Sequence, residues 1–282
     1  MQKRIYGSSG EMLSIIGFGG IVVTNEEQRD ANNYVAEAFD RGVNYFDVAP
    51  SYGNAEEKLG PALVGKRNSI FLACKTEKRT AKEAEAALHN SLKLLKTDRF
   101  DLYQLHGVTT VEEVETIFAP GGAMETLLKA REKGFVRYLG FSAHSDEAAL
   151  ALFDGFEFNS ALFPVNWACF LSNGFGTKIM KKAEEKGAAR LALKAMAHSG
   201  LAEGEERPFE KLWYRPIEEK EHAALALRYT LSQPVTAAIP PGDVRLFRWA
   251  LEAAEDFKPV SAQETELLKE RSGKAVPVFP EK

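Results

Sequence analysis

Four ionisable side chains stand at or just after short apolar runs in the first part of the chain. Asp47 lies near the end of one run, and Tyr52 lies in the loop that follows it. Lys75 and His106 end the next two runs. Alone, such an aspartate or histidine is most often structural. Because burying Asp47 and Lys75 together costs free energy unless they pair, their joint placement favours a functional site.

These side chains suit the reduction of a carbonyl group, which needs a hydride at carbon and a proton at oxygen. An unperturbed tyrosine, with a pKa of about 10, is a poor proton shuttle at neutral pH. A nearby Lys75 ammonium would stabilise the Tyr52 phenolate and lower that pKa. Asp47 would hold Lys75 in place, and His106 could donate a hydrogen bond to the substrate oxygen.

Short apolar runs alternate with longer amphipathic segments along the chain. Most runs are continuously apolar, which is typical of parallel strands buried on both faces. The predicted strands span residues 15–19, 44–49, 70–75, 100–106, 137–142, 160–166, 189–195 and 236–240. Eight strand–helix units in 282 residues predict an α/β fold, a single-domain (β/α)8 TIM barrel. Polar residues at the carboxyl ends of its strands would share one rim.

The ends of the chain and one helix start carry local signals. Residues 4–14 predict a short β-hairpin that covers one end of a barrel at about 15–256, and 257–282 form a tail. No linker divides the chain, so we expect one domain over 1–282. Thr24 and Glu27 predict a capping box for the next helix.

Composition limits the partners and the compartment. The 36 basic and 40 acidic residues give a net charge of −4, so we expect neither nucleic acid nor membrane as a partner. The two cysteines, Cys74 and Cys169, form no disulfide framework and no metal-ligand spacing. Without a signal-peptide pattern or an apolar stretch of membrane length, the chain is predicted to be a cytoplasmic monomer or small homo-oligomer.

The segment around Asp47 and Tyr52, residues 44–56 (NYFDVAPSYGNAE), resembles the signature of the aldo-keto reductase family. Residues 71–76 (FLACKT) and 101–106 (DLYQLH) resemble that family's lysine and histidine segments. The resemblance extends over nearly the whole chain. It implies a (β/α)8 barrel that reduces aldehydes and ketones, or oxidises alcohols, with NADP(H) and no metal; NAD(H) is the alternative. The implied catalytic residues are Asp47, Tyr52, Lys75 and His106.

The resemblance also implies a nicotinamide site. Gly19 and Gly20 resemble the family's glycine-rich first strand, although a simple turn at the end of a strand explains these two glycines equally well. Ser142 matches the family's amide-binding serine, but alanine follows it where asparagine is usual, and His144 is the candidate substitute. Asn166 is the candidate replacement for the family's glutamine.

The loops after the seventh and eighth predicted strands are expected to hold the cofactor phosphates. Their backbone N–H groups and a helix N-terminus favour anions. The candidates are Ala195, Met196, Ser199, Gly200, Leu201, Ile239, Pro240 and Gly242. Arg245 and Arg248 could bind a 2′-phosphate, although a solvated helix face explains them slightly better and Asp243 would repel a phosphate. NADP(H) therefore rests on the resemblance.

Aromatic residues are candidates for the pocket of a small carbonyl or alcohol substrate. These candidates are Phe18, Trp167, Phe170 and Trp213, with Phe209 and Tyr214. Core packing explains Trp167 nearly as well. The loop 203–216 could cover the site as a lid or pack against the barrel.

Two other functions stay open. A non-catalytic or regulatory subunit could keep the barrel and the cofactor without turnover. A barrel lyase could use Lys75 as a Schiff base, but that leaves Tyr52 without a role.

Overall fold

Eight parallel strands form the wall of a barrel in the computed structural model, which describes residues 1–202, 204–273 and 275–279. The strands are β3 (Gly17–Gly19), β4 (Tyr45–Asp47), β5 (Phe71–Thr76), β6 (Phe100–Val108), β7 (Val136–Ala143), β8 (Ser160–Pro164), β9 (Ala189–Leu193) and β12 (Ala237–Ala238). Neighbours pair in chain order, and a parallel bridge between Ile16 and Ala238 joins the first strand to the last. The predicted (β/α)8 barrel in one domain is confirmed.

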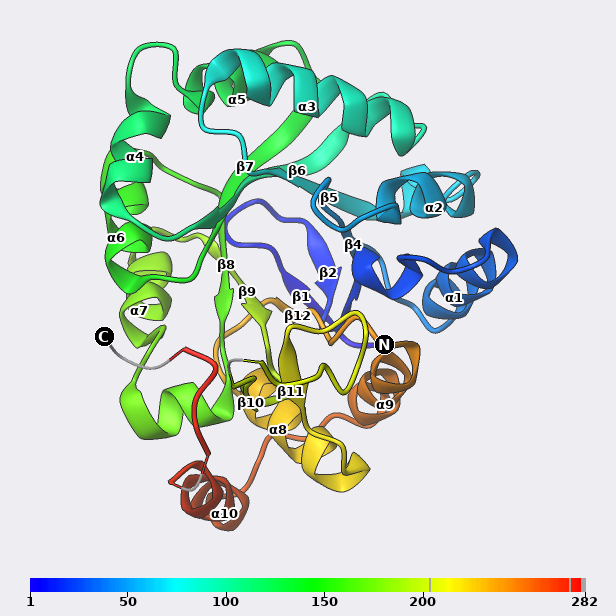
Figure 1. Cartoon of the computed structure of the whole chain (residues 1–282), viewed down its shortest axis with the longest axis vertical. Coiled ribbons are helices and arrows are strands. Elements are labelled where there is room, and N and C mark those ends of the chain that lie inside the picture. Colours follow the sequence, from blue (N-terminus) through cyan, green and yellow to red (C-terminus); the bar gives the residue numbers. More distant parts are fainter. Residues whose placement is uncertain (203, 274, 280–282) are drawn as a thin grey trace.

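Helices surround this wall (Figure 1). They are α1 (Gln28–Asp40), α2 (Ala55–Ala62), α3 (Ala81–Leu94), α4 (Val111–Phe118), α5 (Ala123–Glu132), α6 (Asp146–Gly155), α7 (Thr177–Glu185), α8 (Lys220–Ser232), α9 (Val244–Glu255) and α10 (Ala262–Ser272). In α3, for example, the buried residues Ala84, Leu88 and Leu92 are spaced four apart, so they form one face against the strands. Within the described residues, no helix is both long and apolar enough to cross a membrane.

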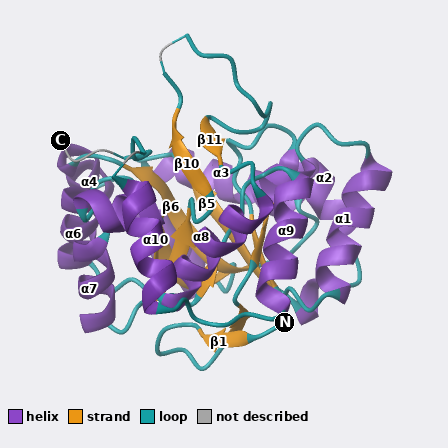
Figure 2. Cartoon of the chain, turned by 90° about the horizontal axis from the view of Figure 1, so that it is seen from below, coloured by secondary structure: helices purple, strands orange, loops and turns teal. Residues whose placement is uncertain are grey.

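A two-stranded hairpin, β1 (Lys3–Ile5) with β2 (Met12–Ser14), closes the amino-terminal end of the barrel, as predicted. Tyr6 is completely buried, and its ring centroid lies 5.0 Å from that of Phe71 and 5.4 Å from that of Tyr138. Figure 2 shows β1 at this end, opposite the long loop beyond β10 and β11. The other end of the barrel therefore remains for the site.

A second hairpin, β10 (Ala197–Gly200) with β11 (Tyr214–Pro216), was not predicted. The loop between these strands contains most of the predicted lid, although Glu203 lies outside the described residues, as do residues 274 and 280–282 of the predicted tail. Lys211 in this loop forms an ion pair with Glu26 and donates to the Val22 carbonyl at 2.9 Å. The loop is thereby tied to the segment after β3.

The predicted capping box before α1 is wrong. The N-cap is Glu27, and its side chain makes no cap hydrogen bond. Thr24 instead donates its hydroxyl to the Tyr52 carbonyl at 3.0 Å. Thr24 therefore braces the loop that carries Tyr52.

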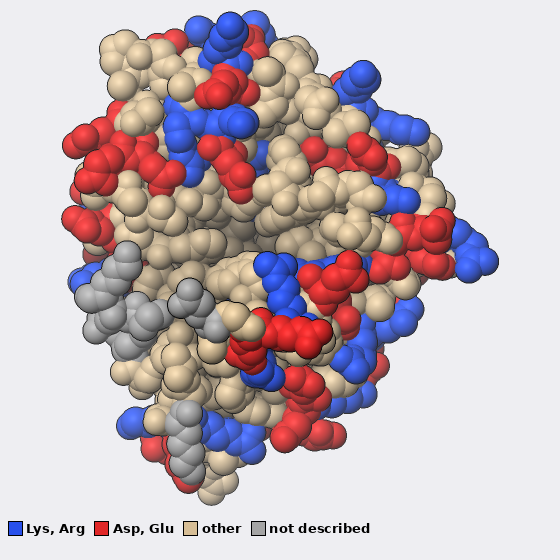
Figure 3. Space-filling model, in the orientation of Figure 1, with Lys and Arg blue, Asp and Glu red and all other residues tan. Residues whose placement is uncertain are grey.

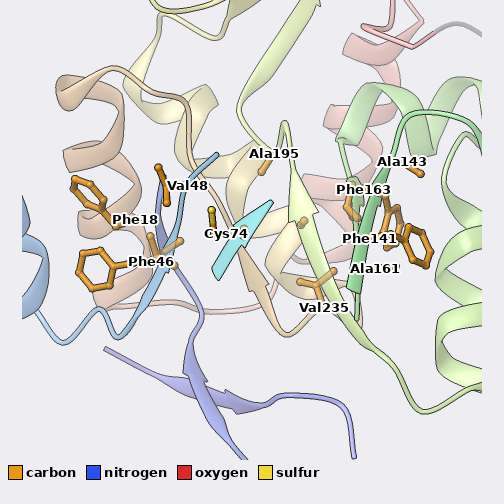
Figure 4. Packing of buried hydrophobic residues seen from close by; sticks show 14 of the residues in the cluster. Phe18, Phe46, Val48, Cys74, Phe141, Ala143, Ala161, Phe163, Ala195 and Val235 are labelled. Carbon is orange, nitrogen blue, oxygen red and sulfur yellow. The ribbon is translucent and has the colours of Figure 1, made fainter. Parts of the chain in front are cut away.

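Phe18 lies in the core, although the sequence placed it in the substrate pocket. Its side chain is completely buried, with ring centroids 5.4 Å from Phe46 and 5.1 Å from Phe247. Figure 4 shows the Phe18 and Phe46 rings side by side. Successive residues of a strand face opposite sides, so Gly19 lines the cavity while Phe18 faces α9.

We expect Phe18→Ala to lower the free energy of unfolding by roughly 3–5 kcal/mol, because it removes a ring from a close-packed core. Urea denaturation measures the loss, provided that the dependence of the unfolding free energy on urea concentration is the same in the variant and the unchanged protein. Val64→Ala, at a side chain that is 66% exposed, is the control and should stay within about 0.5 kcal/mol of the unchanged protein. A Phe18→Ala loss as small as that of the control would contradict the core placement.

Candidate active site

The four side chains singled out by the sequence meet at the carboxyl ends of β4, β5 and β6. The Lys75 ammonium contacts the Asp47 carboxylate and donates to the Tyr52 hydroxyl at 3.2 Å. The Tyr52 and His106 ring centroids are 5.7 Å apart, with the rings nearly perpendicular. All four residues line one cavity.

Two residues that the sequence analysis missed hold Asp47. Its Oδ2 accepts hydrogen bonds from the Tyr45 hydroxyl at 3.1 Å and from Gln104 Nε2 at 3.2 Å. Tyr45 stands two residues before Asp47, on the same face of β4, and Gln104 is the register partner of Lys75. Strand alternation and register are therefore the signals that could have found them.

Lys75 keeps its charge although it is completely buried. Burial lowers the pKa of Lys75, but Asp47 and Tyr52 together outweigh burial, and the net pKa is raised above its ordinary value. A Schiff-base lysine needs a neutral amine, which a lowered pKa supplies. The charged state of Lys75 therefore disfavours the lyase alternative, which needs Lys75 as a neutral amine.

The pKa of Tyr52 differs from the sequence-based expectation. Burial raises it, and Lys75 opposes burial without cancelling it, so the net pKa lies above its ordinary value. Asp47 also raises the pKa of Tyr52, because its negative charge offsets part of the Lys75 charge. Tyr52 consequently holds its proton throughout the neutral range.

His106 is neutral in this cavity. Burial, followed by the charge of Lys75, lowers its pKa to about 2. Its Nδ1 lies 3.4 Å from both Ser51 Oγ and Glu77 Oε1. These contacts favour opposite tautomers, since the carboxylate can only accept while the hydroxyl can donate. Donation from Nε2 to a substrate requires the tautomer in which Ser51 donates to Nδ1.

The cavity has a volume of about 120 Å³. Figure 3, in the orientation of Figure 1, shows a hollow in the middle of this face, bordered largely by uncharged side chains. The expected cofactor and substrate residues that line the cavity are Gly19, Ser142, His144, Ile239, Pro240, Gly242, Trp213 and Tyr214. Lys211 and Leu212 of the predicted lid also line the cavity, and the lining residues not expected from the sequence include Ile21 and Lys194. Lys194 follows an apolar run at the same rim as Lys75, and that position was a usable signal.

Ser142 and His144 provide polar groups suited to an amide. Ser142 Oγ accepts from the Gly107 N–H at 2.8 Å, which leaves its own hydroxyl proton available. Within the described residues, His144 Nε2 is buried without a hydrogen-bond partner. Burial and Lys194 lower the pKa of His144 to about 4, so the ring is neutral. An unsatisfied buried polar atom beside a cavity fits a ligand amide.

The structure does not bring Asn166 to the cavity. Its Nδ2 donates to the carbonyls of Lys194 and Ala197 at 2.8 and 2.9 Å. Its Oδ1 accepts from the backbone N–H groups of Ala168 and Cys169. The amide is fully used in bracing the turns after β8 and β9, because β8 ends at Pro164, before Asn166 is reached.

Two expected substrate-pocket residues also lie elsewhere. Trp167 is completely buried, donates to the Ala197 carbonyl at 3.1 Å and packs against His222. Phe170 packs against the core in a π-helical turn, Cys169–Asn173. Neither residue lines the cavity.

The segment after β9 is not the open loop that the sequence suggested. Ala195 and Met196 are completely buried. Ser199 and Gly200 belong to β10, opposite Arg215 and Tyr214 of β11, and Leu201 follows this strand. Gly20 also lies away from the cavity lining: it begins the 3-10 helix η1 (Gly20–Val23), and a Cβ there would lie 2.7 Å from Val48.

The start of α9 is occupied by its own side chains. The Asp243 carboxylate caps it, accepting from the N–H groups of Arg245 and Leu246. The Arg248 guanidinium donates hydrogen bonds of 2.8–3.1 Å to the Glu37 carboxylate. The Arg245 guanidinium lies over the Phe209 and Trp249 rings, and its side chain is 58% exposed. Arg245 is therefore the more available of the two arginines.

Across residues 1–202, 204–273 and 275–279, no three His, Cys, Asp or Glu side chains gather as a metal site requires.

Comparisons with known proteins find relatives among the oxidoreductases. The oxidoreductase YqkF of Bacillus subtilis is 32% identical over 157 residues, which cover 51% of this chain and 49% of that protein. The methylglyoxal reductase YeaE of Escherichia coli is 31% identical over 149 residues, half of each chain. The chain thus spans about half the length of these curated relatives.

Solved structures show the same fold over nearly the full length. The holo form of the aldo-keto reductase AKR11C1 from Bacillus halodurans superposes with a TM-score of 0.76 at 24% identity, over 98% of each chain. The family model described as the aldo/keto reductase family matches residues 15–258. The chain belongs to the aldo/keto reductase family.

Proposed function

We propose that the protein is a nicotinamide-dependent oxidoreductase that reduces aldehydes or ketones to alcohols, or catalyses the reverse, with Tyr52 as the general acid. The observation that carries this proposal is the 3.2 Å contact between Lys75 Nζ and the Tyr52 hydroxyl at the edge of the cavity. Two relatives, the uncharacterized oxidoreductase YqkF and the methylglyoxal reductase YeaE, support the same class of reaction.

The residues divide the work of proton transfer. A bound reduced nicotinamide would supply a hydride to the carbonyl carbon. Tyr52 gives its proton to the carbonyl oxygen, and the Lys75 ammonium stabilises the phenolate that remains. His106 donates a hydrogen bond that orients the carbonyl. In the opposite direction the Tyr52 phenolate accepts the alcohol proton.

The cofactor residues follow from the cavity. Ser142 and the unsatisfied His144 Nε2 are suited to the nicotinamide amide. The segment 239–242 extends the same cavity toward α9, where Arg245 is the available cation for a 2′-phosphate. Family resemblance and Arg245 support NADP(H), whereas the Asp243 cap would also suit NAD(H).

Of the predicted lid, residues 203–216, the described part of the loop between β10 and β11, residues 204–213, serves as the lid. A cavity of about 120 Å³ is smaller than the roughly 300–1,000 Å³ of typical ligand sites. Leu212 and Trp213 of this loop line the cavity, so their displacement would enlarge it. The Lys211–Glu26 ion pair would hold the loop closed.

We expect Tyr52→Phe to lower kcat/KM for aldehyde reduction roughly 10²–10⁴-fold, because the proton donor is lost. Absorbance of the reduced nicotinamide measures turnover, and quenching of tryptophan fluorescence measures cofactor binding, which should persist. Tyr34→Phe, on the outer helix α1, is the control. Full activity in Tyr52→Phe would refute the proton-donor role. Cofactor binding without turnover in the unchanged protein would favour the non-catalytic alternative.

The pH profiles of the two directions should differ. The raised pKa of Tyr52 keeps the acid present, so reduction of an uncharged aldehyde should be flat from about pH 6 to 9 and fall only above about pH 10. Oxidation needs the phenolate and should rise with pH. His106, with its pKa lowered to about 2, should cause no fall in activity on the acidic side of either pH profile. A reduction profile that falls near pH 7 would argue against this assignment.

Arg245→Ala should weaken NADPH binding roughly two- to tenfold and leave NADH binding nearly unchanged, because only NADPH carries the 2′-phosphate. Fluorescence titrations with both cofactors give the ratio. Arg248→Ala is the comparison, and its effect should be smaller because Glu37 already binds that guanidinium. Equal losses for NADPH and NADH would rule out 2′-phosphate recognition by Arg245.

A further inference from the structure

A second lysine, Lys194, reaches the cavity from the side opposite the four catalytic candidates Asp47, Tyr52, Lys75 and His106. Lys194 follows β9, and its backbone φ of +63° lies in the left-handed region that residues other than glycine rarely adopt. Its Nζ lies 4.7 Å from the Trp213 ring centroid and 4.6 Å from that of Tyr214. These two rings stand nearly perpendicular, 5.5 Å apart, and form two walls around the ammonium.

The charges that line the cavity do not balance. Asp47 is the lining carboxylate, and Lys75 already occupies it. Lys211 is paired with Glu26. Within the part of the chain that the structure describes, no carboxylate lies within 4.0 Å of Lys194 Nζ. Among the described residues, aromatic faces hold the Lys194 ammonium, and they stabilise a cation less than a carboxylate does.

The Lys194 charge acts on the reacting end of the cavity. Burial, and then Lys75, lower the pKa of Lys194 to about 8. Lys194 in turn contributes to the lowered pKa values of His106 and His144. A ligand with a negative group beside the carbonyl would offset this surplus of positive charge.

We propose that Lys194 binds the carboxylate of the carbonyl substrate, so that the preferred substrates are aldehydes or ketones that carry a carboxylate. This assignment deepens the proposed function and rests on it. An anion could also come from the cofactor pyrophosphate. The substrate is favoured because Lys194 acts electrostatically on His106, the residue expected at the carbonyl. The phosphate candidates that line the cavity are Ile239, Pro240 and Gly242, near the start of α9, whereas Ala195 and Met196 beside Lys194 are completely buried.

The test compares each acid with its uncharged methyl ester. Succinic semialdehyde and 4-carboxybenzaldehyde, with their methyl esters, are assayed with the full chain. The unchanged protein should prefer both acids. Lys194→Met should lower kcat/KM for the acids roughly ten- to hundredfold, mainly through KM, and leave the esters nearly unchanged. Lys194→Arg should recover part of the preference, because it restores the positive charge.

A matched control separates charge recognition from packing. Lys66→Met removes a different lysine–aromatic contact, with Phe39, outside the cavity. It should leave the acid-to-ester ratio unchanged. If Lys194 only fixed the aromatic loop, Lys194→Met would impair acids and esters alike, and that result would overturn the proposal. An acid-to-ester ratio that is the same in the unchanged protein and in Lys194→Met would also overturn it.

Binding measurements separate the two anion sources and do not depend on turnover. Benzoate should change the tryptophan fluorescence of the unchanged protein, and Trp213→Phe should remove most of that change. Lys194→Met should abolish benzoate binding while its NADPH dissociation constant stays the same. Weaker NADPH binding with unchanged benzoate binding would assign Lys194 to the cofactor phosphates and overturn the substrate role.

The two proposals fail in different ways. If neither acid nor ester is reduced, the proposed function fails, while the benzoate titration still decides whether Lys194 binds a carboxylate. If the esters are reduced and the acid preference is missing, only the role of Lys194 fails.

Discussion

The ion pair between Lys75 and Asp47 is the constraint on which the site depends. Both side chains are almost fully buried at the carboxyl end of the barrel, where an unpaired charge would be strongly destabilising. The pair is stable there because Tyr45 and Gln104 also donate to the Asp47 carboxylate. One consequence is that the Lys75 ammonium is held at hydrogen-bond distance from the Tyr52 hydroxyl. The barrel thus positions a proton donor by satisfying a buried charge.

The balance of forces on Tyr52 determines what that donor can do. Burial favours the neutral phenol, and Lys75 favours the phenolate. Because the effect of burial is the larger, Tyr52 keeps its proton before the reaction. Lys75 then stabilises the phenolate that forms once the proton has been transferred. This is the behaviour required of a general acid in carbonyl reduction. Across the cavity, no carboxylate of the described residues pairs with Lys194, so the lining combines two paired ammonium groups, Lys75 and Lys211, with one unpaired ammonium.

Much of the fold and the four catalytic candidates could be predicted because both depend on local patterns. Continuous apolar runs identified all eight barrel strands, and the polar residues at their ends identified Asp47, Tyr52, Lys75 and His106. The predictions that were wrong depend on information that an apolar run of residues does not contain. Phe18 lies on the outer face of its strand, and Asn166 lies beyond a strand that ends early. The use of the Thr24 hydroxyl and the sign of the Tyr52 pKa shift depend on neighbours and burial that only the folded chain reveals.

The Lys75 ammonium stabilises the Tyr52 phenolate within a cavity whose burial otherwise disfavours it. Ultraviolet difference titration against Tyr52→Phe isolates this phenolate from the other tyrosines. It should appear only above about pH 10, and the double variant Asp47→Asn, Lys75→Met, which removes both charges together, should shift it to still higher pH. A phenolate that forms at the same pH with and without the ion pair would contradict the account.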